Sequence, residues 1–196
     1  MTNLKPIEFG IFMPVANNGW IMSRNSPQFM PTWELNREVG LLAEEIGLHY
    51  LFSMGKWRGL DGETEFWNYT SEAMALSTAL AVVTSKVRIV ASVAPLLIHP
   101  AVMAKMISTI DDVSGGRISI NIITSGNQQE YGQMGLQPDD WDSYRYDYIE
   151  EWLEVARRLW TEDRVNFEGK WFTLKDCMCN PKPVQKPHPR VVCAMA

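Results

Sequence analysis

Asn121 carries the clearest signal for chemistry in this sequence. It interrupts an otherwise apolar stretch, 118–123, that has the composition of a buried strand. A buried amide must find hydrogen-bond partners or cost roughly 1–3 kcal/mol. Alternation along a strand points its side chain away from those of Ile120 and Ile122. The position favours a polar group directed at a ligand, with a structural hydrogen bond as the alternative.

Further polar and aromatic side chains follow the other apolar stretches, where those strands would end. Lys56 and Arg58 come after the second stretch, and their charges suit either a ligand at the mouth of a barrel or the solvent. Ser92 lies near the end of the third stretch and offers a hydroxyl donor. Trp20 and Trp57 lie in the loops after the first two stretches. For each of them, anchoring the loop and contacting a ligand are equally weighted hypotheses.

Metal binding and the common nucleophilic motifs have little support in the sequence. His49, His99 and His188 each lack a second histidine, cysteine or carboxylate at the spacing of a metal site. Cys177 and Cys179 form a Cys-x-Cys in a late loop, which we interpret as spare thiols. There is no nucleophile elbow, P-loop or kinase signature. We therefore expect no metal.

The elements that would position these residues alternate between two periodicities. Short apolar runs predict strands at 7–13, 50–52, 87–93, 118–123 and 190–194, with a hairpin at 165–172. Apolar residues at helical spacing predict helices at 35–46, 74–83, 102–113 and 149–160. Nearly unbroken apolar strands alternating with helices indicate a parallel sheet covered by helices.

The parallel sheet could be doubly wound or part of a barrel. A dinucleotide-binding fold would place G-x-G-x-x-G after the first strand, and residues 13–18 do not contain it. Long polar and aromatic loops after the strands are typical of a barrel, which takes roughly 250 residues. Since five strands cannot close a barrel, we predict that 1–196 form the N-terminal part of a single (β/α)8 TIM-barrel domain.

The composition is that of an ordinary globular protein. The chain has 196 residues, of which 46% are hydrophobic, with a formal net charge of −5 and three cysteines. A mildly acidic balance without a Lys/Arg cluster argues against nucleic acid as a partner. No run of about 18 apolar residues could span a membrane, and no secretory signal is visible. We expect reduced thiols and a cytoplasmic location.

Several short motifs carry a family resemblance. Ser-Gly-Gly-Arg at 114–117 follows Thr-Ile-Asp at 109–111, and two narrower motifs are Asn-Asn-Gly-Trp at 17–20 and Thr-Glu-Phe-Trp at 64–67. The first pair resembles the bacterial-luciferase-like flavin monooxygenases as a whole, and the narrower two resemble their pyrimidine-oxidising branch. The resemblance covers nearly the whole chain and implies a TIM barrel roughly twice as long.

The resemblance also implies cofactors and partners. It implies reduced FMN as co-substrate, supplied by a separate NAD(P)H-dependent flavin reductase, with O2 as the second co-substrate and a homo-oligomeric protein. The flavin contacts that it implies are Gly55, Lys56, Asn121, Glu130, Arg145 and Tyr146. A phosphate-binding serine would follow just beyond Ala196.

The resemblance assigns oxygen binding to Asn121 and Ser92, the proposed catalytic pair. Two positions depart from the family pattern: Ser92 stands where the relatives carry threonine, and Thr124-Ser125-Gly126 replaces Thr-Gly-Trp. Both changes reshape the pocket near the reacting flavin. They bear on the substrate more than on the chemistry, because the donors are retained.

Three functions follow as hypotheses. The leading one is an FMNH2- and O2-dependent monooxygenase that opens a uracil-like N-heterocycle through a flavin peroxide, in pyrimidine degradation with NADH as the electron source. The second keeps the flavin and oxidises a sulfone or alkanesulfonate, an alternative raised by the 124–126 departure. The third is a non-catalytic flavin-binding module or inactive fragment, because half a barrel lacks the remaining strands.

Overall fold

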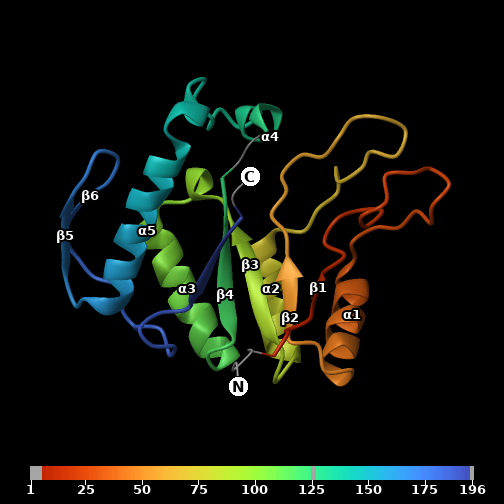
Figure 1. The fold of residues 1–196 in the computed structure, drawn as a ribbon, viewed down its shortest axis with the longest axis horizontal. Helices are drawn as coiled ribbons and strands as arrows, with labels where there is room; N and C mark the ends of the chain where they lie inside the picture. The colour runs from red at the N-terminus through yellow and green to blue at the C-terminus, as the bar shows by residue number, and fades with distance from the viewer. Residues whose placement is uncertain (1–5, 125–126, 195–196) are drawn as a thin grey trace, which may run out of the picture.

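The chain forms one five-stranded parallel sheet whose strand order follows the sequence (Figure 1). The computed structural model describes residues 6–124 and 127–194. Each strand pairs in parallel with the next, in the order β1 (Gly10–Phe12), β2 (Tyr50–Ser53), β3 (Arg88–Val93), β4 (Ile118–Ile123) and β7 (Arg190–Ala194). A doubly wound sheet reverses its strand order at a switch point, whereas a barrel does not. The predicted part-barrel is confirmed.

Helices follow the strands and cover one face of the sheet. They are α1 (Trp33–Glu45), α2 (Ala73–Val83), α3 (Pro100–Ser114) and α5 (Arg145–Thr161). All four predicted helices are present, as is the predicted hairpin, β5 (Val165–Glu168) with β6 (Thr173–Cys177), which lies beside α5 in Figure 1. Among the described residues, no helix is both long and apolar enough to cross a membrane.

The sequence did not predict three short helical segments, and it predicted too long a first strand. The segments are α4 (Gln128–Gly132) and the 3-10 turns η1 (Pro95–Leu97) and η2 (Trp141–Ser143). Each is too short to show a helical repeat. The predicted strand 7–13 is reduced to β1, because its partner β2 begins only at Tyr50, opposite Gly10.

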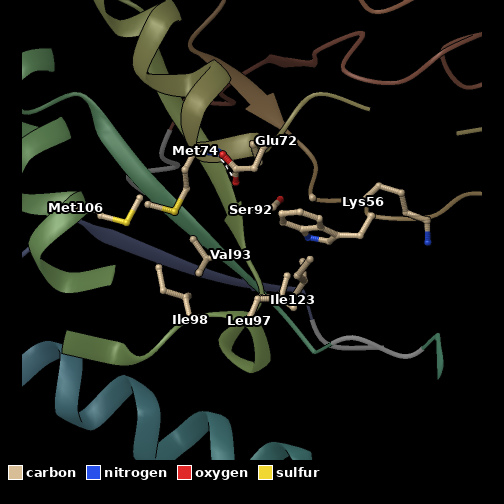
Figure 2. Close-up of a pocket in the computed structure, with 13 residues that line it drawn as sticks. Lys56, Glu72, Met74, Ser92, Val93, Leu97, Ile98, Met106 and Ile123 are labelled. Atoms are coloured by element: carbon tan, nitrogen blue, oxygen red, sulfur yellow. Dashed lines mark hydrogen bonds between the residues drawn. The ribbon is translucent and has the colours of Figure 1, made fainter. Parts of the chain in front are cut away.

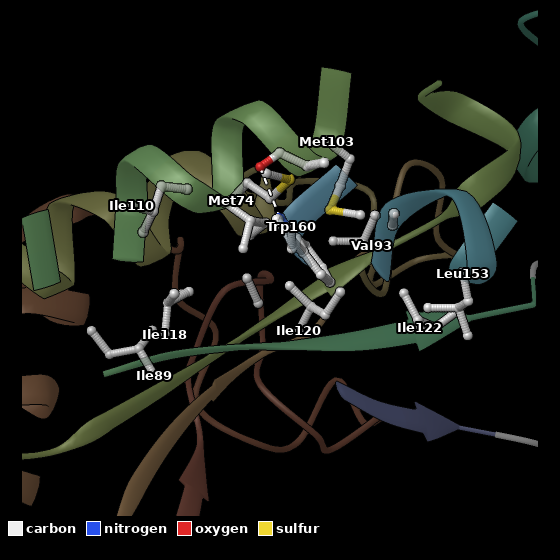
Figure 3. Close-up of a cluster of buried hydrophobic side chains, with 14 of the residues drawn as sticks. Met74, Ile89, Val93, Met103, Ile110, Ile118, Ile120, Ile122, Leu153 and Trp160 are labelled. Atoms are coloured by element: carbon white, nitrogen blue, oxygen red, sulfur yellow. Dashed lines mark hydrogen bonds between the residues drawn. The ribbon is translucent and has the colours of Figure 1, made fainter. Parts of the chain in front are cut away.

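The two faces of β3 and β4 differ sharply in character. Ile118, Ile120 and Ile122 are at most 1% exposed and point toward the helices, and Figure 3 shows Ile120 beneath Trp160. The Trp160 Nε1 donates to the carbonyl oxygen of Ala104 at 3.0 Å, which satisfies the buried indole. Burial of each isoleucine contributes about 1.5–3 kcal/mol. The opposite face carries the polar members of the same strands.

A pair of charged side chains binds the loop 84–87, which leads from α2 into β3. The Glu44 carboxylate accepts hydrogen bonds from the backbone N–H groups of residues 85–87, at 2.6–2.9 Å to Oε2. The Arg117 guanidinium donates to the carbonyl oxygens of Ala81, Thr84 and Val87 at 2.8–3.0 Å. Together, Glu44 and Arg117 pair with both the backbone N–H groups and the carbonyl oxygens of a loop that lacks regular structure. Left unpaired, these backbone groups would destabilise the fold.

The Glu44 carboxyl titrates far below its ordinary range. Burial raises its pKa, but four hydrogen bonds from Val87, Lys86 and Ser85 outweigh burial and lower the pKa to about 2. Because the folded pKa lies below the ordinary value of 4.5, Glu44 stabilises the fold fully above pH 4.5. That stabilisation is lost as the pH falls from 4.5 through 2.

We predict that Glu44→Gln lowers the free energy of unfolding at pH 7 by on the order of 1 kcal/mol, since charged hydrogen bonds become neutral ones. The difference from wild type should shrink as the pH falls below 4.5. Urea denaturation at pH 7, 5 and 3 measures both effects. Glu45→Gln, at the exposed neighbouring position, is the matched control and should change little. A pH-independent difference for Glu44→Gln would contradict this role.

Candidate active site

Asn121 and Ser92 lie side by side on the sheet face that points away from the helices. They are paired in register between β3 and β4, and the Asn121 Nδ2 donates to the Ser92 Oγ at 3.1 Å. The two residues are only 2% and 4% exposed. The structure thus brings together the two residues predicted to act as a pair.

The Asn121–Ser92 pair has spare hydrogen-bonding capacity. The Asn121 Oδ1 is buried and has no partner among the described residues. Because the Ser92 oxygen accepts from Asn121, its own hydroxyl hydrogen is available as a donor. A ligand with both donor and acceptor atoms, such as the edge of a flavin ring, would satisfy both groups. The donor set therefore fits a flavin.

Lys56 and Glu130 form an ion pair across the end of the sheet. The Lys56 Nζ lies 2.7 Å from the Glu130 Oε2, and the backbone N–H of Trp57 donates to the Glu130 Oε1 at 2.6 Å. Glu130 is 4% exposed and lies on α4, after β4, whereas Lys56 follows β2. Since both carboxylate oxygens already bind the Lys56–Trp57 segment, Glu130 is placed to orient the Lys56 ammonium.

A cavity of about 240 Å³ opens at the C-terminal end of β3. Figure 2 shows Met74 and Met106 on one side of this cavity and Lys56 on the opposite side. Ser92 lies between the two sides. At Gly55, an added Cβ would lie 3.1 Å from the Ile123 Cδ1, so glycine lets this loop approach the sheet closely. The cavity combines apolar walls with a few polar groups, which is typical of a small-molecule site.

Arg145 and Tyr146 begin α5 near the ends of β4 and β7. The Arg145 Nη1 donates to the Asp142 Oδ1 at 2.8 Å, and the guanidinium lies 5.0 Å from the centre of the Tyr146 ring. The Arg145 Nε is buried without a partner among the described residues. An unsatisfied guanidinium N–H at a helix N-terminus suits an anionic group such as a phosphate. Tyr146 also lines a second cavity of about 250 Å³ that includes Cys193 of β7.

Other candidates have structural partners instead. Arg58 pairs with Asp61 at 3.3 Å on the surface, and the His99 Nδ1 accepts from the Ala101 N–H at the start of α3. The His188 ring stacks on Trp160. Within residues 6–124 and 127–194 there is no group of three metal-ligating side chains. The departure at Ser125 and Gly126 lies outside the described residues.

A model of the family described as "Luciferase-like monooxygenase" matches residues 7–196. The chain belongs to this family. It is 44% identical to "Pyrimidine monooxygenase RutA" of Klebsiella pneumoniae and 41% identical to the protein of that name from Methylorubrum extorquens. Each match covers 96% of this chain and about half of the relative, 52% and 51%. The chain thus spans about half the length of the curated relatives it matches.

Solved structures share the fold at low sequence identity. EDTA monooxygenase (EmoA) from Chelativorans sp. BNC1 superposes with a TM-score of 0.82 at 19% identity, over 98% of this chain and 50% of that one. Long-chain alkane monooxygenase (LadA) gives 0.81 at 20% identity, over 98% and 52%. Their match to only half of each structure agrees with the predicted part-barrel.

We predict that Glu130→Gln lowers the free energy of unfolding by about 1–3 kcal/mol, because it leaves the largely buried Lys56 ammonium without its counter-charge. Urea denaturation measures the loss, and limited proteolysis should show faster cleavage near residues 54–60. Glu63→Gln is the matched control: Glu63 pairs with Arg24 at the same 2.7 Å, but both side chains are 73% exposed. Equal effects of the two substitutions would show that the Lys56–Glu130 pair is an ordinary surface contact.

Proposed function

We propose that the whole protein is a flavin-dependent monooxygenase that oxidises a uracil-like N-heterocycle. The observation that carries the proposal is the buried Asn121–Ser92 pair, with its unpartnered amide oxygen, beside an apolar cavity. The 44% identity to pyrimidine monooxygenase supports the substrate class. Residues 1–196 would then be the N-terminal part of a single luciferase-like TIM-barrel domain.

Reduced FMN, when bound, would supply the electrons that activate O2. Gly55, Lys56, Asn121, Arg145 and Tyr146 are the residues proposed to hold it, with Glu130 as a contact that also orients Lys56. Lys56 and Arg145 can neutralise negative charge on the cofactor, and the arginine does so with fixed geometry. These contacts are assigned by family motif, and the unpartnered Arg145 Nε supports them.

Asn121 and Ser92 are proposed to stabilise negative charge on oxygen during the reaction. The amide and hydroxyl hydrogens are donors held in place by the strand register, so they need no reorganisation as charge develops. Met74, Met106 and Ile123 line the apolar side of the cavity and would exclude water from it. Water exclusion strengthens each hydrogen bond to a charged oxygen.

A separate NAD(P)H-dependent flavin reductase is the partner that this proposal requires, with NADH as one electron source. We also propose a cytoplasmic homo-oligomer. The test is an assay of the full-length protein with FMN, a flavin reductase, NADH and a substrate panel. Oxygen-dependent loss of uracil absorbance supports the proposal, sulfite release from an alkanesulfonate supports the second candidate, and oxidation of neither supports a binding module.

We predict that Asn121→Ala lowers product formation on the order of 100-fold, the effect of losing one oxyanion-type donor. Hydrogen peroxide release per NADH should rise, and FMN affinity should change much less. Ser92→Ala should show a smaller loss in the same direction, and Ser92→Thr should be tolerated. The matched control is Ser119→Ala, two residues earlier on the same face of β4. Near wild-type turnover in Asn121→Ala, with unchanged peroxide release, would leave Asn121 with a structural role only.

A further inference from the structure

Four aromatic rings gather at the C-terminal ends of β1 and β2, apart from the flavin contacts proposed above. The Phe12 ring of β1 lies 4.5 Å from that of Phe52 on β2 and 5.0 Å from that of Trp20 in the following loop. Trp20 in turn meets Trp67 edge-on at 4.9 Å. We refer to Phe12, Phe52, Trp20 and Trp67 as the aromatic cluster.

The register of the sheet places Phe12 and Phe52 of the aromatic cluster on the same face as Asn121 and Ser92. Phe12 is aligned with Phe52, and Phe52 with Val90, which lies two residues before Ser92. Side chains two residues apart on a strand share a face. β1 and β4 are separated by three strand spacings, about 14 Å. Trp20 contacts the Phe12 ring at the β1 edge of this face.

Two loops far apart in sequence are bonded together so as to hold Trp67. The Asn17 Nδ2 donates to the Glu65 carbonyl oxygen at 3.0 Å, and the Asn18 Nδ2 donates to that of Thr64 at 3.1 Å. The Trp67 Nε1 donates to the Gly19 carbonyl oxygen at 2.6 Å. The motifs 17–20 and 64–67 are therefore one physical unit, built from buried amides and backbone carbonyls.

The backbone at Trp67 is strained. Its φ is +67°, in the left-handed region that a bulky residue seldom adopts. Phe66 stacks on the same indole at 4.5 Å, and a Cβ at Gly59 would overlap the Phe66 carbonyl oxygen. Strain of this kind persists where the surroundings over-determine a conformation, and it concentrates at functional sites.

Trp20 is covered less than Trp67 by the other described residues of this chain. It is 51% exposed, and no hydrogen bond to its indole occurs in the described part of the chain. An exposed tryptophan that is held edge-on by a second, anchored tryptophan presents a rigid aromatic surface. Stacking of a planar base on an aromatic side chain contributes to affinity without any hydrogen bond.

We propose that Trp20 is a specificity-determining residue that stacks on the planar ring of the substrate, and that Trp67 is a positioning residue that holds Trp20. The inference rests on the proposed function and deepens it, because stacking on Trp20 would favour flat heterocycles over flexible chains or saturated rings. Trp67 acts only through Trp20 and needs no contact with the substrate.

The test compares Trp20→Phe, Trp20→Leu and Trp20→Ala in the full-length protein with FMN, a flavin reductase and NADH. Uracil is the planar probe and 5,6-dihydrouracil the saturated one, with binding measured by calorimetry on the FMN-loaded protein. Trp20→Leu and Trp20→Ala should raise the uracil KM at least tenfold, within the range of a stacking contact, with kcat changed much less. The preference for uracil over dihydrouracil should fall by a similar factor.

Trp20→Phe keeps an aromatic ring and should retain most of the preference for uracil over dihydrouracil. Trp67→Phe removes the hydrogen bond to the Gly19 carbonyl oxygen and should lose part of that preference. Met22→Ala, an exposed apolar residue of the same loop, is the matched control and should leave both probes unaffected. If wild type consumes uracil and Trp20→Leu keeps its KM and its preference, the stacking role is overturned while the proposed function stands. If wild type neither binds nor consumes uracil, both are overturned.

Discussion

The register between β3 and β4 is the constraint on which the site and the core both depend. Pairing of Ser92 with Asn121 puts these two polar groups on one face and the isoleucines of β4 on the other. A slip of one residue would bury Asn121 among the helices and expose Ile120 and Ile122 on the opposite face. Because a large apolar area would be lost with the slip, the core itself fixes the geometry of the polar pair.

The sequence predicted those features that depend on local periodicity, including the polar break that Asn121 makes in an apolar strand. The pairing of Asn121 with Ser92 came from the family resemblance, because the two residues lie 29 positions apart on different strands. The sequence did not predict the Lys56–Glu130 pair as a contact, since the two residues are 74 positions apart and α4 is too short to show a repeat. The partners of Glu44 are backbone N–H groups, and the residue types in a sequence do not indicate where such groups lie. The left-handed backbone at Trp67 is likewise invisible, because no glycine marks it.

The motifs behind the family resemblance divide by physical role. In Ser-Gly-Gly-Arg, Gly115 ends α3 with a φ of +64°, and Arg117 binds the carbonyls of the loop before β3. That motif maintains the barrel. The narrower motifs, 17–20 and 64–67, hold each other at the mouth of the sheet and shape its aromatic cluster. The broad motif thus supports the fold, and the narrow ones hold the rings to which we assign substrate stacking.

The Glu44–Arg117 clamp around loop 84–87 lies at the start of β3, at the end of the strand opposite to Ser92. This separation bears on how the protein can be diversified in the laboratory. A combinatorial library that varies Trp20 and its exposed neighbours 21–22 touches none of the hydrogen bonds of the clamp. A larger share of its members should therefore remain folded than in a library that varies residues 81–87, because the clamp stays intact.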